Sequence, residues 1–214
     1  MAISALFQFF IIILSAIVHE YAHAWAAFKQ GDLTAKYEGR LTLNPLAHID
    51  WFGTVFLPLM ILYISGGGAF FGYAKPVPIN PYNFKDQRRG MIWVSLAGVA
   101  ANFSIALIAG LGLRFFPQIF LNDLFNVQAA GGQIFNAWAV IVIINIWLAL
   151  FNLLPFPPLD GSKLLMALTN VGRSTSGRVL SFFASPFGFI IAIFIAMTFL
   201  PTLSQVIFTL IVGG

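Results

Sequence analysis

The sequence contains no cysteine and few charged residues. The absence of cysteine excludes disulfides and thiolate zinc sites, so a metal would have to be bound through nitrogen and oxygen. Only 8% of the 214 residues are charged, whereas 59% are hydrophobic, a composition typical of polytopic membrane proteins. No basic patch with interleaved aromatic residues is present, and we therefore expect no nucleic-acid partner.

The apolar stretch 13–28 contains the motif His19-Glu20-Tyr21-Ala22-His23. In a helix the two histidines lie one turn apart on the same face, so both can bind one metal ion. This is the pattern in which two histidines hold Zn²⁺ and the glutamate serves as general base. A satisfied core histidine is the simpler alternative. It does not explain three ionisable groups in one hydrophobic span, where each is costly.

Hydrophobic runs predict an all-α polytopic membrane protein with about four transmembrane helices in a single membrane-embedded domain, residues 1–214. Every Lys and Arg except Arg114 falls on one side of the predicted topology, which the positive-inside rule makes cytoplasmic. Both termini are then outside, and the His-Glu motif lies toward the cytoplasm. The predicted helices cover residues 3–28, 91–116, 134–157 and 179–200.

The region between the first two predicted helices, residues 32–74, combines β-like and re-entrant character. Alternation over residues 34–43 favours a short strand or hairpin. The apolar segment 52–73 is broken by Pro58 and a glycine run, and basic residues flank it on both sides, which favours re-entry over spanning. Prolines predict an extended segment over 75–84, and Pro201 is expected to end the last helix.

A catalytic zinc needs a third protein ligand, and Asp160 is the best candidate. The topology places it on the same membrane side as the His-Glu motif, at a similar depth. The alternative is an aspartate that caps the helix that follows it. Glu38 and Asp123 are weaker candidates because one lies in a polar loop and the other on the outer side.

Several motifs in order resemble the site-2 protease family of intramembrane metalloproteases. They are the His-Glu motif, Gly98-Val99-Ala100-Ala101-Asn102 and the run 152–161, Asn-Leu-Leu-Pro-Phe-Pro-Pro-Leu-Asp-Gly. The stretches 39–50 and 74–81 resemble a compact bacterial branch without a PDZ or CBS domain. The chain departs from the family pattern at Val99, where a proline is usual, and at Trp51, where the compact branch commonly has proline.

The resemblance implies a membrane-embedded zinc protease with three core helices around one Zn²⁺. It assigns zinc binding to His19, His23 and Asp160 and water activation to Glu20. It also implies single-span membrane protein substrates, cleaved near the cytoplasmic side of a bacterial inner membrane in regulated intramembrane proteolysis.

Three further residues are candidate substrate or oxyanion contacts. Asn102 and Asn152 resemble family positions of that kind, although ordinary interhelical hydrogen bonding suits them equally. His48 either acts near the metal or is a loop histidine bonded to backbone.

Two other functions fit the sequence. A metal or small-solute transporter also places polar groups at membrane depth, but the acidic and histidine groups here gather at one end only. A non-catalytic membrane adaptor that kept the fold would tolerate loss of Glu20. Substrate identity and oligomeric state do not follow from the sequence.

Overall fold

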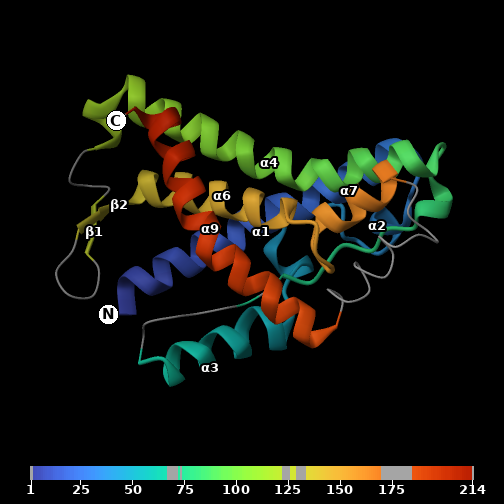
Figure 1. Cartoon of the computed structure of the whole chain (residues 1–214), viewed down its shortest axis with the longest axis horizontal. Helices are drawn as coiled ribbons and strands as arrows, with labels where there is room; N and C mark the ends of the chain where they lie inside the picture. Colours follow the sequence, from blue (N-terminus) through green and yellow to red (C-terminus); the bar gives the residue numbers. More distant parts are fainter. Residues whose placement is uncertain are drawn as a thin grey trace.

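The computed structural model describes residues 2–66, 72, 74–121, 126–128, 134–169 and 185–213 and is largely helical (Figure 1). Within these residues, three stretches of helix are long and apolar enough to cross a membrane. They belong to α1 (Ala2–Gln30), α4 (Gln87–Phe115) and α9 (Pro186–Val212). The apolar helix α6 (Ala137–Leu153) has 17 residues and is shorter than a usual span. The predicted count of four spans is therefore not confirmed.

Helix α4 packs against both α1 and α6, and in the view of Figure 1 it runs above them. Its buried face consists mostly of small residues, which lets neighbouring helices approach closely. A continuous apolar core joins it to α6 and α9, and its buried members are Ala106, Ala109, Leu113, Val142, Ile146, Leu150, Ala196 and Leu200. This packing, together with direct contacts between α1 and α6, holds the three helices in fixed positions relative to one another.

The start of α6 and the end of α9 differ from the prediction. Residues 134–136 form a strand, and Asn136 then caps α6 by accepting hydrogen bonds from Trp138 N and Ala139 N. Helix α9 continues through Pro201 to Val212, because apolar surroundings leave a chain segment few alternatives to helical hydrogen bonding. Residues 179–184 of the predicted last helix lie outside the described residues.

The β-like segment expected over 34–43 is not confirmed. Residues Thr34–Tyr37 form the short helix α2, because the Asp32 carboxylate accepts a hydrogen bond from Thr34 N and starts a helical turn. Among the described residues, strands occur instead between α4 and α6, where β1 (Asn126–Gln128) pairs antiparallel with β2 (Ile134–Asn136). The short surface helix α5 (Pro117–Phe120) precedes them.

The segment that was expected to re-enter the membrane forms a six-residue π-helical stretch, Trp51–Phe56, followed by the eight-residue helix α3 (Leu57–Ile64). Together they are too short to span. The ends of the segment meet, because Lys75 N donates a hydrogen bond of 2.9 Å to His48 O. The chain thus leaves and returns at one place; residues 67–71 and 73 lie outside the described residues.

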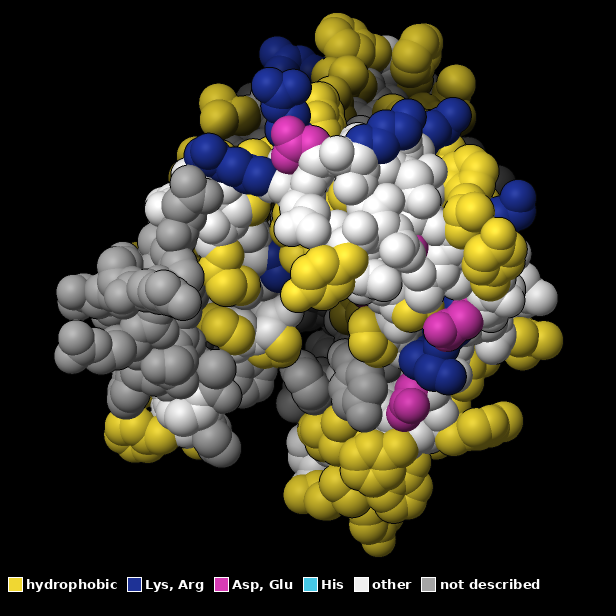
Figure 2. Space-filling model, turned by 90° about the vertical axis from the view of Figure 1, so that its right-hand side faces the viewer, with side chains coloured by type: hydrophobic (Ala, Val, Ile, Leu, Met, Phe, Trp, Pro, Cys, Tyr) yellow, Lys and Arg dark blue, Asp and Glu magenta, His cyan; other side chains and the backbone are white. Residues whose placement is uncertain are grey.

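Both chain ends lie at the same end of the molecule (Figure 1). The opposite end carries the last turn of α1, the first turn of α4 and α7 (Asp160–Thr169). Figure 2 shows this end with lysine and arginine side chains spread over its face and hydrophobic side chains around them. Arg114 lies at the other end of α4, where it donates a hydrogen bond to Leu210 O of α9. Charge is therefore distributed unequally between the two ends.

Candidate metal centre

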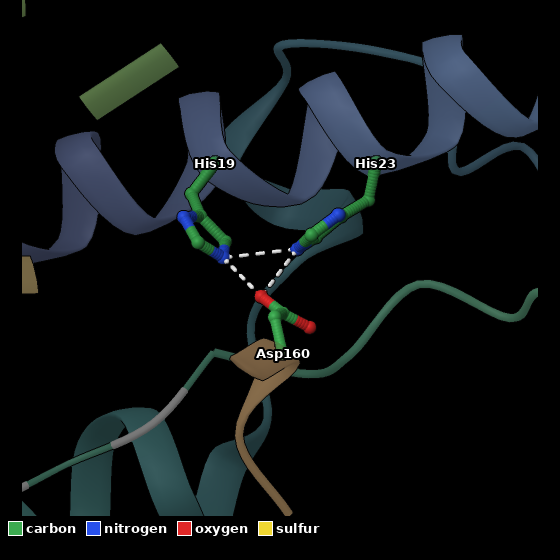
Figure 3. Close-up of side chains that lie close together, drawn as sticks. All are labelled: His19, His23 and Asp160. Atoms are coloured by element: carbon green, nitrogen blue, oxygen red, sulfur yellow. Dashed lines mark hydrogen bonds and ion pairs between the residues drawn. The ribbon is translucent and has the colours of Figure 1, made fainter. Parts of the chain in front are cut away.

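Two histidines of α1 and one aspartate of α7 bring three potential ligand atoms together. Figure 3 shows the His19 and His23 imidazoles extending from α1 toward the Asp160 carboxylate. The Nε2 atoms of His19 and His23 are 3.0 Å apart, and they lie 3.0 and 2.8 Å from Asp160 Oδ2. All three residues are buried, although their positions in the chain are up to 141 residues apart. Within the described residues, this is the group suited to holding a metal ion.

The opposite ring nitrogens fix the chemistry of this cluster. Nδ1 of His23 lies 2.7 Å from Val94 O, which can only accept, so this nitrogen carries a proton. Nδ1 of His19 lies 2.6 Å from Asn102 Oδ1 and is likewise a donor. In the neutral rings, both Nε2 atoms then present lone pairs to each other and to a carboxylate oxygen. These three lone pairs repel one another unless a cation lies between them.

The spacing of the three atoms suits zinc. Tetrahedral ligands at zinc–ligand distances of about 2.0–2.2 Å lie about 3.3–3.6 Å apart, so the separations of 2.8–3.0 Å found here need to widen only slightly. Two imidazoles and one carboxylate also form a known catalytic zinc set that leaves a coordination position open. The residues therefore fit a zinc ion, and binding it would remove the repulsion among the three lone pairs.

Two glycines let the ligands approach. A Cβ on Gly98 of α4 would lie 2.6 Å from Nε2 of both His19 and His23, so a larger residue there would push into the cluster. A Cβ on Gly161 would collide with the carbonyl oxygens of Leu153 and Leu154 at the end of α6. Gly161 thus allows the first turn of α7 to rest against α6, which places Asp160 beside α1.

The second oxygen of Asp160 has its own partner. Lys163, one turn later on α7, donates a hydrogen bond of 2.9 Å from Nζ to Oδ1. This contact reserves Oδ2 for the cluster and partly balances the buried carboxylate. Asp160 is also the first residue of α7, but among the described residues its carboxylate accepts no hydrogen bond from a backbone N–H of that helix. The contacts therefore do not support the alternative role as a helix cap.

Glu20 lies next to His19 on α1 and is partly buried. Its Oε2 accepts a hydrogen bond of 2.8 Å from Val77 N. Val77 belongs to the segment 74–80, which lacks helix and strand as its prolines predicted, and its side chain packs against Ala24 and Ala35. The predicted extended segment does not continue to residue 84, because Pro81–Asn83 form a 3-10 turn capped by the Asn80 side chain. Val77 was not among the predicted site residues, because a contact between residues 57 positions apart has no local signal.

The 74–80 segment is held in place by Asp32, just beyond the end of α1. The Asp32 carboxylate accepts hydrogen bonds from Thr34, from Asn80 N at 2.8 Å and from Asn83 Nδ2 at 2.8 Å. Burial raises the pKa of this carboxyl, but the hydrogen bonds from Thr34, Asn83 and Asn80 outweigh it and leave the pKa below its usual value. Asp32 therefore remains an anion that joins two loops.

Asn102 does not face an open site. Its side chain is fully buried on α4, where Oδ1 contacts His19 and Nδ2 donates to Asn145 Oδ1 at 2.9 Å. Asn145 of α6 and Ser15 of α1 complete this buried group, since Asn145 Nδ2 donates to Ser15 Oγ at 3.0 Å. The sequence did carry a signal for Asn145: it is an amide in an otherwise strongly apolar helix.

The remaining predicted residues lie apart from the ligand triangle. Asn152 donates to Leu148 O within α6. His48 is buried, and its Nε2 donates to Thr42 O at 2.8 Å, as expected for a loop histidine bonded to backbone. Glu38 is exposed at the end of α2, and Asp123 lies outside the described residues.

Comparison with known proteins agrees with this geometry. The family model for "Peptidase family M50" matches residues 7–127 and 117–199. The chain belongs to peptidase family M50. This M50 peptidase is 36% identical over 203 residues to "Putative zinc metalloprotease YwhC" of Bacillus subtilis, covering 95% of this chain and 84% of that protein. It is 30% identical over 200 residues to "Putative zinc metalloprotease Rip2" of Mycolicibacterium smegmatis, covering 93% and 69%.

No solved structure matches the M50 peptidase described here. Membership of the family, which is that of the site-2 proteases, makes the chain a membrane-embedded zinc metalloprotease. The predicted family and enzyme class are thereby confirmed, and the transporter alternative is not favoured.

Proposed function

We propose that His19, His23 and Asp160 bind the zinc ion of this protease and that Glu20 is its general base. The observation that carries the proposal is the triangle of three lone-pair atoms, each 2.8–3.0 Å from the others. Glu20 follows directly after one of the three residues on the same helix. The reaction is hydrolysis of peptide bonds within transmembrane segments of single-span membrane proteins.

Each part of the site has a distinct chemical task. When bound, zinc activates the attacking water and polarises the scissile carbonyl. Glu20 accepts the proton of that water and later transfers it to the leaving amine. Because Val77 N holds Oε2 of Glu20, Oε1 is the oxygen that receives the proton. The Lys163 bond to Asp160 keeps that carboxylate oriented throughout.

A substrate helix has to lose its hydrogen bonds before its backbone can reach this buried site. A strand over residues 34–43 would have offered an edge for the unwound substrate, and the helical turn at Thr34–Tyr37 argues against that role. The extended segment that includes Val77 is a better candidate, since it touches Glu20 directly. Asn152, half-buried at the end of α6, remains a candidate contact for substrate backbone.

The charge asymmetry supports a cytoplasmic location of the site. Lys29 lies in the last turn of α1, on the same side as the ligands. Arg88, at the start of α4, donates hydrogen bonds to Ala167 O and Leu168 O at the end of α7, also on this side. By the positive-inside rule this end faces the cytoplasm, with both termini outside, in the plasma membrane of a bacterium. The bond from Lys75 N to His48 O brings the two ends of the segment together, which supports its re-entry from the same side.

The decisive experiment compares wild type with Glu20→Gln in detergent or liposomes. We expect both proteins to bind one zinc per chain and only the wild type to cleave a panel of single-span substrates with unstable transmembrane helices. Equal cleavage by the variant would refute the role of Glu20. Zinc retention in a His19→Ala, His23→Ala double variant would refute the ligand assignment. A non-catalytic adaptor would instead retain its cellular function with Glu20→Gln.

A further inference from the structure

A buried chain of three polar side chains lies behind the ligand triangle and is not used in the reaction described above. It runs from His19 of α1 through Asn102 of α4 to Asn145 of α6 and returns to Ser15 of α1. Asn102 and Asn145 are fully buried, and Ser15 is nearly so. Amides are costly in an apolar interior, so their arrangement calls for a physical reason.

The orientation of the Asn145 amide is fixed by the backbone. One of its terminal atoms lies 2.9 Å from Ile141 O, a carbonyl that can only accept a hydrogen bond. That atom is therefore the amide nitrogen, and the same nitrogen reaches Ser15 Oγ. The opposite atom of Asn145 is then the oxygen, and it faces Asn102.

The Asn102 amide is fixed in turn. Its nitrogen donates to Asn145 Oδ1 at 2.9 Å and lies 3.3 Å from Ser15 O, both of which accept. Its oxygen must therefore face His19, where it lies 2.6 Å from Nδ1. An amide oxygen in that position requires a proton on Nδ1 and leaves the lone pair of His19 on Nε2, toward Asp160.

We propose that Asn145 is a positioning residue for the metal site: it orients the Asn102 amide and thereby sets the ring tautomer of His19 that can bind zinc. Asn145 touches neither the ligand triangle nor Glu20, and it acts only through Asn102. His23 needs no such relay, because Val94 O fixes its tautomer directly. The inference rests on the proposed role of His19 as a zinc ligand.

Zinc affinity, measured by chelator competition, tests the proposal independently of proteolysis. Asn145→Leu removes the acceptor at nearly constant volume, and we expect affinity to fall about 10- to 100-fold, as is usual when a partner of a metal-bound histidine is lost. In Asn145→Asp the buried carboxyl has to be protonated, so that its O–H donates to Ile141 O and its other oxygen stays in front of Asn102. We expect the zinc affinity of this variant within about threefold of wild type, a small change on that scale. Ser104→Ala on α4, whose exposed hydroxyl donates to Ala100 O, is the control and should retain wild-type zinc affinity.

A double-variant cycle separates positioning from a general packing effect. If Asn145 acts through Asn102, Asn145→Leu adds no further loss of affinity to Asn102→Leu. The proposal would be overturned if the two substitutions lowered zinc affinity by factors that multiply in the double variant. It would also be overturned if Asn145→Leu bound zinc as tightly as wild type. Retention of zinc by His19→Ala would instead overturn the ligand assignment, so the two failures are distinguishable.

Should Asn145→Leu not fold, the wild-type protein still provides a test. The sequence has three histidines, so ¹⁵N labelling restricted to histidine gives few imidazole signals. In the zinc-loaded protein we expect Nδ1 of His19 to carry the proton. A proton on Nε2 of His19 would contradict the proposal that Asn145 sets the His19 tautomer through Asn102.

Discussion

The backbone N–H of Val77 donates a hydrogen bond of 2.8 Å to the Glu20 carboxylate. The bond joins the proposed general base on α1 to an extended segment 57 residues further along the chain. Side-chain packing of Val77 against α1 and α2 keeps the two in register. Glu20 is thus oriented by backbone, which no side-chain motif could reveal.

Replacing Val77 by proline removes this donor while the extended backbone can persist. A hydrogen bond to a charged group contributes about 1.5–3 kcal/mol, so we expect cleavage to slow roughly tenfold or more with zinc content unchanged. The measurement is the single-turnover cleavage rate beside metal analysis. Val77→Ala keeps the N–H and is the control, and an equal loss in both variants would assign the effect to packing.

Gly98→Ala should weaken zinc binding. Its Cβ would lie 2.6 Å from Nε2 of His19 and of His23, and helix α4 has little room to move. We expect roughly a tenfold or greater loss of affinity in chelator competition, comparable to loss of a supporting contact. Gly112→Ala on the same helix approaches only the Phe120 ring, at 3.1 Å, and should bind zinc normally. Normal affinity in Gly98→Ala would show that the ligand atoms can shift without cost.

His48→Ala should retain zinc and lower stability. The variant leaves Thr42 O without its donor next to the Lys75–His48 backbone bond, which costs about 1–3 kcal/mol. We expect a lower thermal midpoint and an unchanged cleavage rate per folded molecule. Lost cleavage with intact fold and zinc would instead support a direct role of His48 at the reacting centre.

We expect Asp32 to make the free energy of unfolding depend on pH. Its folded-state pKa lies below the unfolded value, so the stabilisation is complete above pH of about 4 and is lost as pH falls through the folded pKa. Asp32→Asn should lower the free energy of unfolding by about 1–3 kcal/mol at pH 7. In this variant the free energy of unfolding should also fall less steeply as the pH is lowered. Denaturation of both proteins between pH 7 and pH 3 measures this; parallel curves would exclude Asp32 as the source.

The sequence predicts the long apolar helices, and the structure brings together the three residues predicted as ligands. Ionisable groups at helical spacing in an apolar run have few uses, and charge bias placed Asp160 at the depth of His19. Prediction from the sequence fails where a local contact outweighs the hydrophobic pattern. Asp32 starts a helical turn in place of the expected strand, and α9 passes through Pro201.

Contacts between distant residues were beyond prediction for another reason. Asn145 and Val77 gain their roles only after helices and loops have packed. A lone amide in an apolar helix indicates that a partner exists, but its identity depends on the rotation of three helices about one another.

The ligand triangle draws on both α1 and α7, which has a consequence for biosynthesis. A growing chain that has not yet reached residue 160 carries only the two histidines, and its α1 is inserted without a complete site. With this ligand set, zinc-dependent hydrolysis cannot begin until α7 has been synthesised and has packed against α1.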